Sequence, residues 1–178
     1  MIRIISGSHK GRRIAAPKTL PTRPTTDMAK ESLFNILNNQ FYFDEITALD
    51  LCSGTGNISY ELASRGCPNI TAIDADRQCV RFINETAEKL ELNSISVFQA
   101  EVMAYLKSCK QQFDLIFADP PFDYESYEEL VALIWEQKLL TDEGLLVVEH
   151  ISSSSLEELP HFSHSRRYGN ITFSFFEE

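Results

Sequence analysis

Apolar runs alternate with amphipathic stretches along most of the chain. Runs of six or seven largely apolar residues occur at 46–51, 69–74, 95–100, 113–119 and 144–150, and each predicts a buried strand. Between them, apolar residues recur at helical spacing, as at Val80, Ile83 and Ala87. Strands that are apolar throughout are typical of a parallel sheet with helices on both faces. The pattern therefore predicts an α/β fold.

The two ends of the chain depart from this alternation. Near the N-terminus, short β-branched runs flank a turn that contains glycine, which predicts a β hairpin within residues 1–25. A helix is expected to follow, from Thr26 as its N-cap to Phe41. After residue 150, a polar connection leads to two further strands within 163–176, joined at Gly169–Asn170. We expect this second hairpin to finish the sheet.

The 178 residues suit one domain with a small extension, which we divide into a basic hairpin extension, 1–25, and a main domain, 26–178. Four cysteines occur without a CxxC pair, so we expect reduced thiols packed as small hydrophobes and no metal site. No apolar run approaches the length of a membrane span, and the N-terminus does not resemble a signal peptide. We therefore expect a cytoplasmic monomer with no membrane partner.

The distribution of charge is more informative than its total. The formal net charge is −10, yet residues 1–30 contain seven basic side chains and a single acidic one. A local basic patch is sufficient for binding phosphates, because neighbouring side chains make those contacts. We predict that the extension binds RNA through Lys10, Arg12, Arg13 and Arg23. Arg166 and Arg167 are the next candidates.

A turn that contains two glycines follows the first strand of the main domain, within ALDLCSGTGN (48–57). Ligands of open α/β sheets bind at this edge, and Gly54 and Gly56 allow the backbone to turn tightly there. The third glycine of the dinucleotide fingerprint is missing, because Ser59 stands in its place. Asp50 would repel a pyrophosphate and suits the cationic ammonium end of S-adenosylmethionine. Asp74, at the end of the next strand, is placed to accept hydrogen bonds from ribose hydroxyls.

Further positions complete the predicted cofactor site. Glu101, just after the third strand, is placed to reach the adenine amino group of the cofactor, although capping of the following helix is an alternative role. We also include Ser53, Ala75 and Val102, which neighbour the residues already named.

The fourth strand of the main domain ends in Asp119-Pro120-Pro121-Phe122. Two prolines fix the backbone and present carbonyl oxygens rigidly. The Asp119 carboxylate and the Pro120 carbonyl can each accept one N–H of a nucleobase amino group, so that the nitrogen lone pair is aimed at the methyl donor. Such acceptors stabilise the charge that develops on the nitrogen in the transition state. Phe122 can stack on the base. The alternative is a proline-stiffened strand end without a catalytic role, which the glycine turn and Asp74 disfavour.

Together these motifs resemble a known family. DPPF is the (N/D)PP(Y/F) signature of amino methyltransferases, and the chain is similar to the bacterial RsmD family in RIISGSHKGRRI near the start and in 23–37, 49–66, 72–76 and 114–122. The resemblance implies a Rossmann-like class I S-adenosylmethionine-dependent methyltransferase fold, with a mainly parallel seven-stranded sheet closed by the antiparallel hairpin. Cys52, where the family commonly has an aromatic residue, and Glu101, where it has aspartate, depart from the family pattern.

The resemblance also implies a reaction and a partner. The family methylates the exocyclic N2 amino group of one guanine, guanine 966 of 16S ribosomal RNA, within the assembled small subunit. Asp50, Gly54, Gly56 and Asp74 match its cofactor positions, and residues 119–122 match its catalytic motif.

Three other functions stay open. An adenine N6 methyltransferase acting on DNA or RNA would use the same tetrapeptide. A non-catalytic RNA-binding module with this fold is disfavoured by the intact Asp119, Asp50 and Asp74. A nicotinamide oxidoreductase is disfavoured by the missing third glycine.

Overall fold

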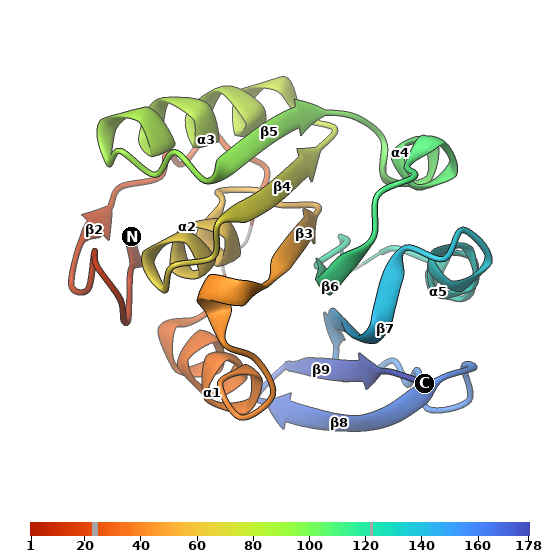
Figure 1. Cartoon of the computed structure of the whole chain (residues 1–178). Coiled ribbons are helices and arrows are strands. Elements are labelled where there is room, and N and C mark those ends of the chain that lie inside the picture. Colours follow the sequence, from red (N-terminus) through yellow and green to blue (C-terminus); the bar gives the residue numbers. More distant parts are fainter. Residues whose placement is uncertain (23–24, 122) are drawn as a thin grey trace.

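A computed structural model describes residues 1–22, 25–121 and 123–178 of the chain, so the predictions made for Arg23 and Phe122 lie outside the described residues. The centre of the molecule is a seven-stranded sheet (Figure 1). Its strands are β3 (Thr47–Leu51), β4 (Asn69–Asp74), β5 (Ile95–Gln99), β6 (Phe113–Ala118), β7 (Leu140–Ile151), β8 (Phe162–Tyr168) and β9 (Ile171–Phe176).

The order of the strands across the sheet is β5-β4-β3-β6-β7-β9-β8. The first five strands in this order are parallel, whereas β9 pairs antiparallel with both β7 and β8. This confirms a mainly parallel sheet that ends in an antiparallel hairpin. The chain proceeds outward from β3 through β4 to β5 and then crosses back to β6, on the other side of β3. Because these strands are parallel, the carboxyl ends of β3, β4 and β6 lie beside one another.

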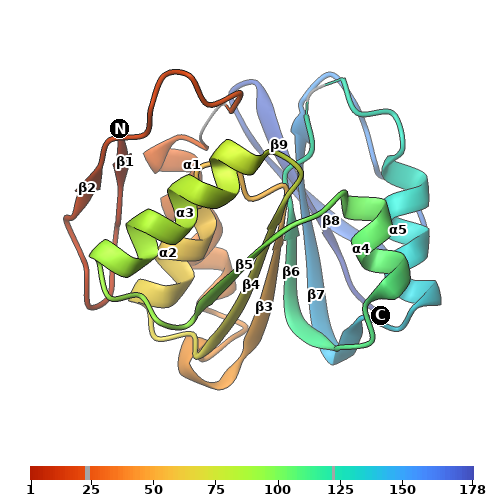
Figure 2. The ribbon, with the colours of Figure 1, turned by 90° about the horizontal axis from the view of Figure 1, so that it is seen from above.

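Within the described ranges, five α-helices cover the two faces of the sheet (Figure 2). One face carries α1 (Asp27–Leu37), α2 (Asn57–Ser64) and α3 (Arg77–Lys89), and the other carries α4 (Val102–Ser108) and α5 (Tyr127–Glu136). A short 3-10 helix, η1 (Phe43–Glu45), precedes β3.

The end of one helix and the start of one strand differ from the prediction. The Thr26 side chain accepts a hydrogen bond from the Ala29 backbone N–H at 3.3 Å, as its role of N-cap requires, but α1 ends at Leu37 and Phe41 lies in the turn beyond it. Helix α5 ends at Glu136, and Lys138 then adopts a left-handed φ of 53°. β7 therefore begins at Leu140, four residues before the predicted start. The hydrophobic pattern did not predict either boundary, because apolar side chains continue past the turn in both places.

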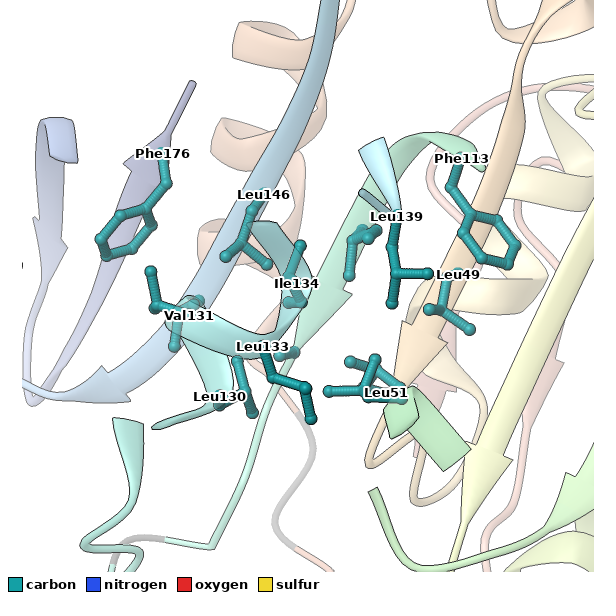
Figure 3. Packing of buried hydrophobic residues seen from close by; sticks show 14 of the residues in the cluster. Leu49, Leu51, Phe113, Leu130, Val131, Leu133, Ile134, Leu139, Leu146 and Phe176 are labelled. Atoms are coloured by element: carbon teal, nitrogen blue, oxygen red, sulfur yellow. The ribbon is translucent and has the colours of Figure 1, made fainter. Parts of the chain in front are cut away.

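The α4–α5 face of the sheet is packed with apolar side chains. Figure 3 shows Leu130 and Ile134 of α5 against Leu49 of β3, Leu146 of β7 and Phe176 of β9. The opposite face has its own apolar cluster, which includes Phe34 of α1 and Phe117 of β6. Charged side chains are buried on that side as well, namely Lys30, Asp50, Glu61 and Glu149.

The N-terminal extension contains the predicted hairpin, formed by β1 (Ile2–Arg3) and β2 (Arg13–Ile14). It lies against α2 and α3, where Ile2, Ile4 and Ile14 pack with Tyr60 and Ile83. The backbone N–H groups of residues 5 and 6 donate to the Glu61 carboxylate at 2.9 and 3.0 Å. The hairpin is therefore docked on the main domain through both apolar and polar contacts.

Candidate functional site

A cavity of about 650 Å³ lies at the carboxyl ends of β3, β4 and β6. Ten residues predicted from the sequence line it: Asp50, Ser53, Gly54, Asp74, Ala75, Glu101, Val102, Asp119, Pro120 and Pro121. Gly56 is not part of the lining. The fold thus gathers the predicted cofactor residues and the described part of the predicted catalytic motif around a single space.

The glycine turn between β3 and α2 is held by the end of β4. The Ser53 backbone N–H donates to the Ile73 carbonyl at 2.9 Å, and the Gly54 N–H donates to an Asp74 carboxylate oxygen at 2.8 Å. Gly56 has a φ of 82°, and a Cβ there would stand 2.7 Å from the Tyr60 ring. Packing inside the protein and the left-handed φ therefore already require glycine at this position.

Cys52 precedes this turn with a left-handed φ of 56°, which is uncommon for a residue other than glycine. It is half-buried and lines the cavity, whereas Cys67, Cys79 and Cys109 are buried. All four cysteines are free thiols. The expectation that the thiols are packed as small hydrophobes therefore holds for the three buried cysteines. It is wrong for Cys52, because this thiol forms part of the cavity wall.

Asp50 is a buried carboxylate at the floor of the cavity, with 1% of its surface exposed. The Ser59 hydroxyl donates to its Oδ2 at 2.6 Å. Burial raises the pKa of Asp50 to about 7, and Asp74 contributes to this rise, while the hydrogen bond from Ser59 opposes it. A cationic group in the cavity would favour the ionised form of Asp50.

Asp74 is half-buried at the end of β4, and its two oxygens accept the backbone N–H groups of Gly54 and Asp76, each at 2.8 Å. Each carboxylate oxygen can accept more than one hydrogen bond, so the contact with a ribose stays available. Burial raises the pKa of Asp74, and the two backbone hydrogen bonds oppose the rise. Asp74 thus shapes the turn as well as the cavity wall.

Glu101 is exposed on the cavity rim and occupies the N-cap position of α4. Its side chain makes no capping hydrogen bond. The capping role, which was the alternative to a ligand contact, is therefore not the one that this structure shows.

Asp119 continues the edge of β6, because its backbone N–H donates to the Leu51 carbonyl at 3.2 Å. Pro120 is buried behind it, and the Tyr124 N–H donates to the Pro121 carbonyl at 2.9 Å, which closes the turn after the motif. The Asp119 side chain lines the cavity. Burial raises its pKa well above the usual range, and the nearby carboxylates of Glu149 and Asp50 raise it further.

Several site residues escaped the sequence reasoning. Pro21, Thr22 and Thr25 bring the N-terminal extension into the cavity wall, where a Cβ on Gly54 would stand 3.0 Å from Thr22. Asn57, Met103 and Tyr124 also line the cavity. Glu149 is buried beside Asp119. The sequence offered one indication of its role, because Glu149 is an acidic residue near the end of an apolar strand, as Asp50 is in β3 and Asp74 in β4.

The basic residues of the first thirty positions divide into two sets. Lys10, Arg12 and Arg13 are exposed on the hairpin, as a role in binding RNA requires. Lys30 is fully buried and pairs with Glu61 at 3.3 Å. Arg3 pairs with Asp27 at 3.0 Å. The count of basic side chains therefore overstates the positive surface of the extension. The other candidates, Arg166 and Arg167, are exposed on β8 at an edge of the sheet.

The cavity fits S-adenosylmethionine by size and charge. Its volume lies within the range of small-molecule sites. Five carboxyl side chains line it, from Asp50, Asp74, Asp76, Glu101 and Asp119, and no lysine or arginine is among the described lining residues. This charge distribution suits a ligand with sulfonium and ammonium groups. Within the described part of the chain, His, Cys, Asp and Glu form no group of three or more that could hold a metal ion, and no helix could span a membrane.

Comparison with known proteins gives consistent matches over nearly the whole chain. The family described as "Conserved hypothetical protein 95" matches residues 2–177. The protein YlbH of Bacillus subtilis is 35% identical over 161 residues, which are 88% of this chain and 86% of YlbH. Ribosomal RNA small subunit methyltransferase D of Escherichia coli K12 is 31% identical over 159 residues, covering 89% of this chain and 79% of that protein.

Solved structures agree with the fold. The Escherichia coli protein yhhF superposes with a TM-score of 0.84 and 28% identity, over 99% of this chain and 97% of that one. Precorrin-6y C5,15-methyltransferase from Geobacter metallireducens superposes with a TM-score of 0.69 at 16% identity, over 92% and 93% of the two chains. The fold is therefore that of the Rossmann-like class I methyltransferases, as predicted.

Proposed function

Because the chain belongs to the conserved hypothetical protein 95 family, to which the RsmD proteins belong, we propose that it methylates the exocyclic N2 amino group of a guanine in 16S ribosomal RNA, with S-adenosylmethionine as the methyl donor. The name of the Escherichia coli relative supports a small-subunit ribosomal RNA as the substrate. The finer parts of the proposal are guanine 966 as the target, the assembled 30S subunit as the substrate, and a monomeric enzyme acting in the cytoplasm.

The observation that carries this proposal is the position of Asp119 and Pro120 in the same cavity as Asp50 and Asp74. In such a cavity a donor's methyl group and an acceptor's amino group can meet. In this proposal Asp74 accepts hydrogen bonds from the ribose hydroxyls, and Asp50 stabilises the cationic amino acid end of the donor.

The chain's own residues prepare the amino nitrogen. The Asp119 carboxylate and the Pro120 carbonyl each accept one N–H, which localises the nitrogen lone pair. When bound, S-adenosylmethionine supplies an electrophilic methyl group on sulfur. Rigid acceptors at this point stabilise the transition state because positive charge grows on the nitrogen there. Phe122 is proposed, from its place in the motif alone, to stack on the base.

The exposed hairpin is the proposed RNA contact. Lys10, Arg12 and Arg13 lie in one solvent-facing segment, whereas the walls of the cavity are acidic. Phosphate binding by the hairpin would offset the repulsion between RNA and the acidic body. Thr25, the last residue of the same extension, lines the cavity.

A methyl-transfer assay tests the proposal. Purified protein is incubated with tritiated S-adenosylmethionine and either unmethylated 30S subunits, naked 16S RNA or duplex DNA, and the labelled nucleoside is identified after digestion. We expect N2-methylguanosine from 30S subunits, mapped to guanine 966. Methylated adenine would instead support the N6 alternative. Binding of the cofactor without any transfer would support a non-catalytic RNA-binding module.

A further inference from the structure

Three carboxylates lie near the carboxyl ends of neighbouring strands on the α1–α2 face of the sheet. Ala118 of β6 is paired with Leu51 of β3 and with Val148 of β7. Side chains alternate between faces along a strand, so Asp50, Asp119 and Glu149 all point to the face opposite these three apolar residues. In strand order, this row of carboxylates has Asp119, one residue beyond β6, between Asp50 on β3 and Glu149 on β7. Asp119 is level with Glu149, whereas Asp50 is paired with Phe117 and so lies two residues further back.

Hydroxyl groups hold the two outer carboxylates but not the middle one. The Ser59 hydroxyl donates to Asp50 at 2.6 Å, and the Thr25 hydroxyl donates to Glu149 Oε2 at 2.6 Å. Within the described ranges, no hydrogen bond reaches the Asp119 carboxylate, which lines the cavity. Glu149 is 3% exposed and is not among the lining residues. Asp119 is therefore free to meet a substrate, while Glu149 stands behind it.

Burial raises the pKa of all three carboxyl groups in the row. It raises the pKa of Glu149 to about 7, while the Thr25 hydroxyl lowers that pKa and so favours the ionised form. The pKa of Asp119 is raised by burial first and next by the charge of Glu149. A hydroxyl-held carboxylate beside Asp119 therefore makes Asp119 a stronger proton acceptor.

We propose that Glu149, held by Thr25, is a positioning residue that acts through Asp119 and strengthens it as the acceptor of the proton that leaves the methylated amino group. This inference rests on the proposed function. It adds a role for a strand residue outside the DPPF motif and for a residue of the N-terminal extension.

Glu149 affects the step in which the methylated amino group loses its excess proton. The amino nitrogen uses its lone pair to form the N–CH₃ bond as the S–CH₃ bond breaks and its electron pair stays on sulfur. The nitrogen then carries one proton in excess, which passes to the Asp119 carboxylate and from there to solvent. A proton on Asp119 is stabilised by the negative charge of Glu149, so the transfer becomes more favourable.

Among the described groups that face Asp119, Asp50 also raises its pKa, after Glu149 in size of effect. Cys52, after β3, and Tyr127, on α5, have pKa values raised by burial, and that of Tyr127 is about 12, so both stay neutral near pH 7. From α2, Ser59 is uncharged. Asp50 is the remaining carboxyl group, and it belongs to the cofactor side of the cavity.

Glu149→Gln tests the proposal, because glutamine has the same shape and can still accept the Thr25 hydrogen bond. Single-turnover methyl transfer to 30S subunits is measured from pH 5.5 to 9 with saturating cofactor. The wild type should show an acid limb, where the rate rises with pH as Asp119 ionises. In Glu149→Gln this limb should move to lower pH by about one unit, since a like charge has been removed. The plateau rate should fall several-fold because Asp119 becomes a weaker base.

Two measurements separate this role from a merely structural one. Cofactor affinity by calorimetry and the melting temperature should stay close to wild type, and Glu128→Gln, an exposed change on α5, is the matched control. A lower plateau with an unshifted acid limb would mean that Glu149 only supports the fold, and would overturn the proposal.

Thr25 provides a second variant that decides the question if Glu149→Gln does not fold. Thr25→Val removes only the hydroxyl donor, so Glu149 keeps its proton to higher pH and the limb should again move to lower pH. Thr25→Ser keeps the donor and should restore the wild-type limb. An unshifted limb in Thr25→Val overturns the inference alone. A wild-type protein that methylates no RNA overturns the proposed function and this inference with it.

Discussion

Between the sheet and helices α4 and α5, the buried side chains drawn in Figure 3 are apolar. The same face also holds a buried hydrogen bond, between His150 Nε2 and Ser174 Oγ at 2.8 Å. Between the sheet and helices α1 to α3, apolar clusters surround buried charged groups. The Lys30 Nζ donates to the Arg3 carbonyl at 2.6 Å and to Asn57 Oδ1 at 2.8 Å, and lies 3.3 Å from Glu61 Oε2. Two faces of one sheet thus use different kinds of interaction.

This difference between the two faces indicates where the protein tolerates substitutions. An apolar cluster depends on volume, and similar side chains replace one another at small cost. A buried ion pair depends on charge and hydrogen-bond geometry, and loss of one partner leaves the other uncompensated. The charged face is also the one that carries Asp50, Asp119 and Glu149, so stability and chemistry depend on the same side of the sheet.

Matched isosteric substitutions on the two faces should give the largest contrast. Glu61→Gln leaves the Lys30 ammonium buried without its counter-ion, and burial already lowers the pKa of Lys30. We expect the free energy of unfolding to fall by about 3–5 kcal/mol. Leu130→Met, on the apolar face, should cost less than about 1.5 kcal/mol. Urea denaturation measures both, and equal losses would remove the distinction between the faces.

The next largest effect concerns the row of carboxylates. Asp119→Ala should lower the rate of methyl transfer by about 10²–10³, because one preorganised acceptor is removed from the transition state. Cofactor affinity by calorimetry should change little. Asp123→Ala, an exposed change four residues further along, is the control and should keep the wild-type rate. If Asp119→Ala retains more than half of the activity, the catalytic assignment is wrong.

Stability should depend on pH because of the charged face. Asp50 and Glu149 have pKa values of about 7 when folded, against about 4 in the unfolded chain. Between these values the folded state holds protons that the unfolded state has released. The free energy of unfolding therefore decreases as pH rises through this window, by at most about 1.4 kcal/mol per pH unit for each group.

Melting temperatures of the cofactor-free protein at pH 5.5, 6.5 and 7.5 measure this trend. The slope should be smaller in Asp50→Asn, which cannot take part in it. A melting temperature that does not fall over the same interval would contradict the raised pKa values of these carboxyl groups.

The smallest effect on stability is expected at the tip of the hairpin, where charge is exposed. Neutralising Arg12 and Arg13 to glutamine should alter the free energy of unfolding by about 0.5 kcal/mol or less. It should weaken RNA binding and reduce the log–log salt slope by about 0.7–0.9 for each phosphate that the variant no longer binds. Neutralising the exposed Lys107 and Lys110 is the matched control. Identical salt slopes for the two double variants would place the RNA-binding surface elsewhere, with Arg166 and Arg167 the next residues to change.

The sequence by itself determined the features that depend on local pattern. β4 spans 69–74, as the apolar run predicts, and the second hairpin turns at Gly169–Asn170 because strand periodicity stops at a residue pair suited to a turn. The positions at the carboxyl ends of β3, β4 and β6 were also foreseeable. Parallel strands bring those ends together whatever the details of packing, and ten of the predicted site residues line one cavity for that reason.

Only the tertiary structure decided which charged residues are buried and what they contact. From the sequence, Lys30 is one more of the basic residues within the first thirty positions, yet it is enclosed because α1 packs against Glu61 of α2. Thr25 and Glu149 are 124 positions apart, and no local pattern links them. Their hydrogen bond exists because the extension crosses the end of β7 beside Asp119. Such contacts depend on how distant elements pack, and packing is a property of the whole fold.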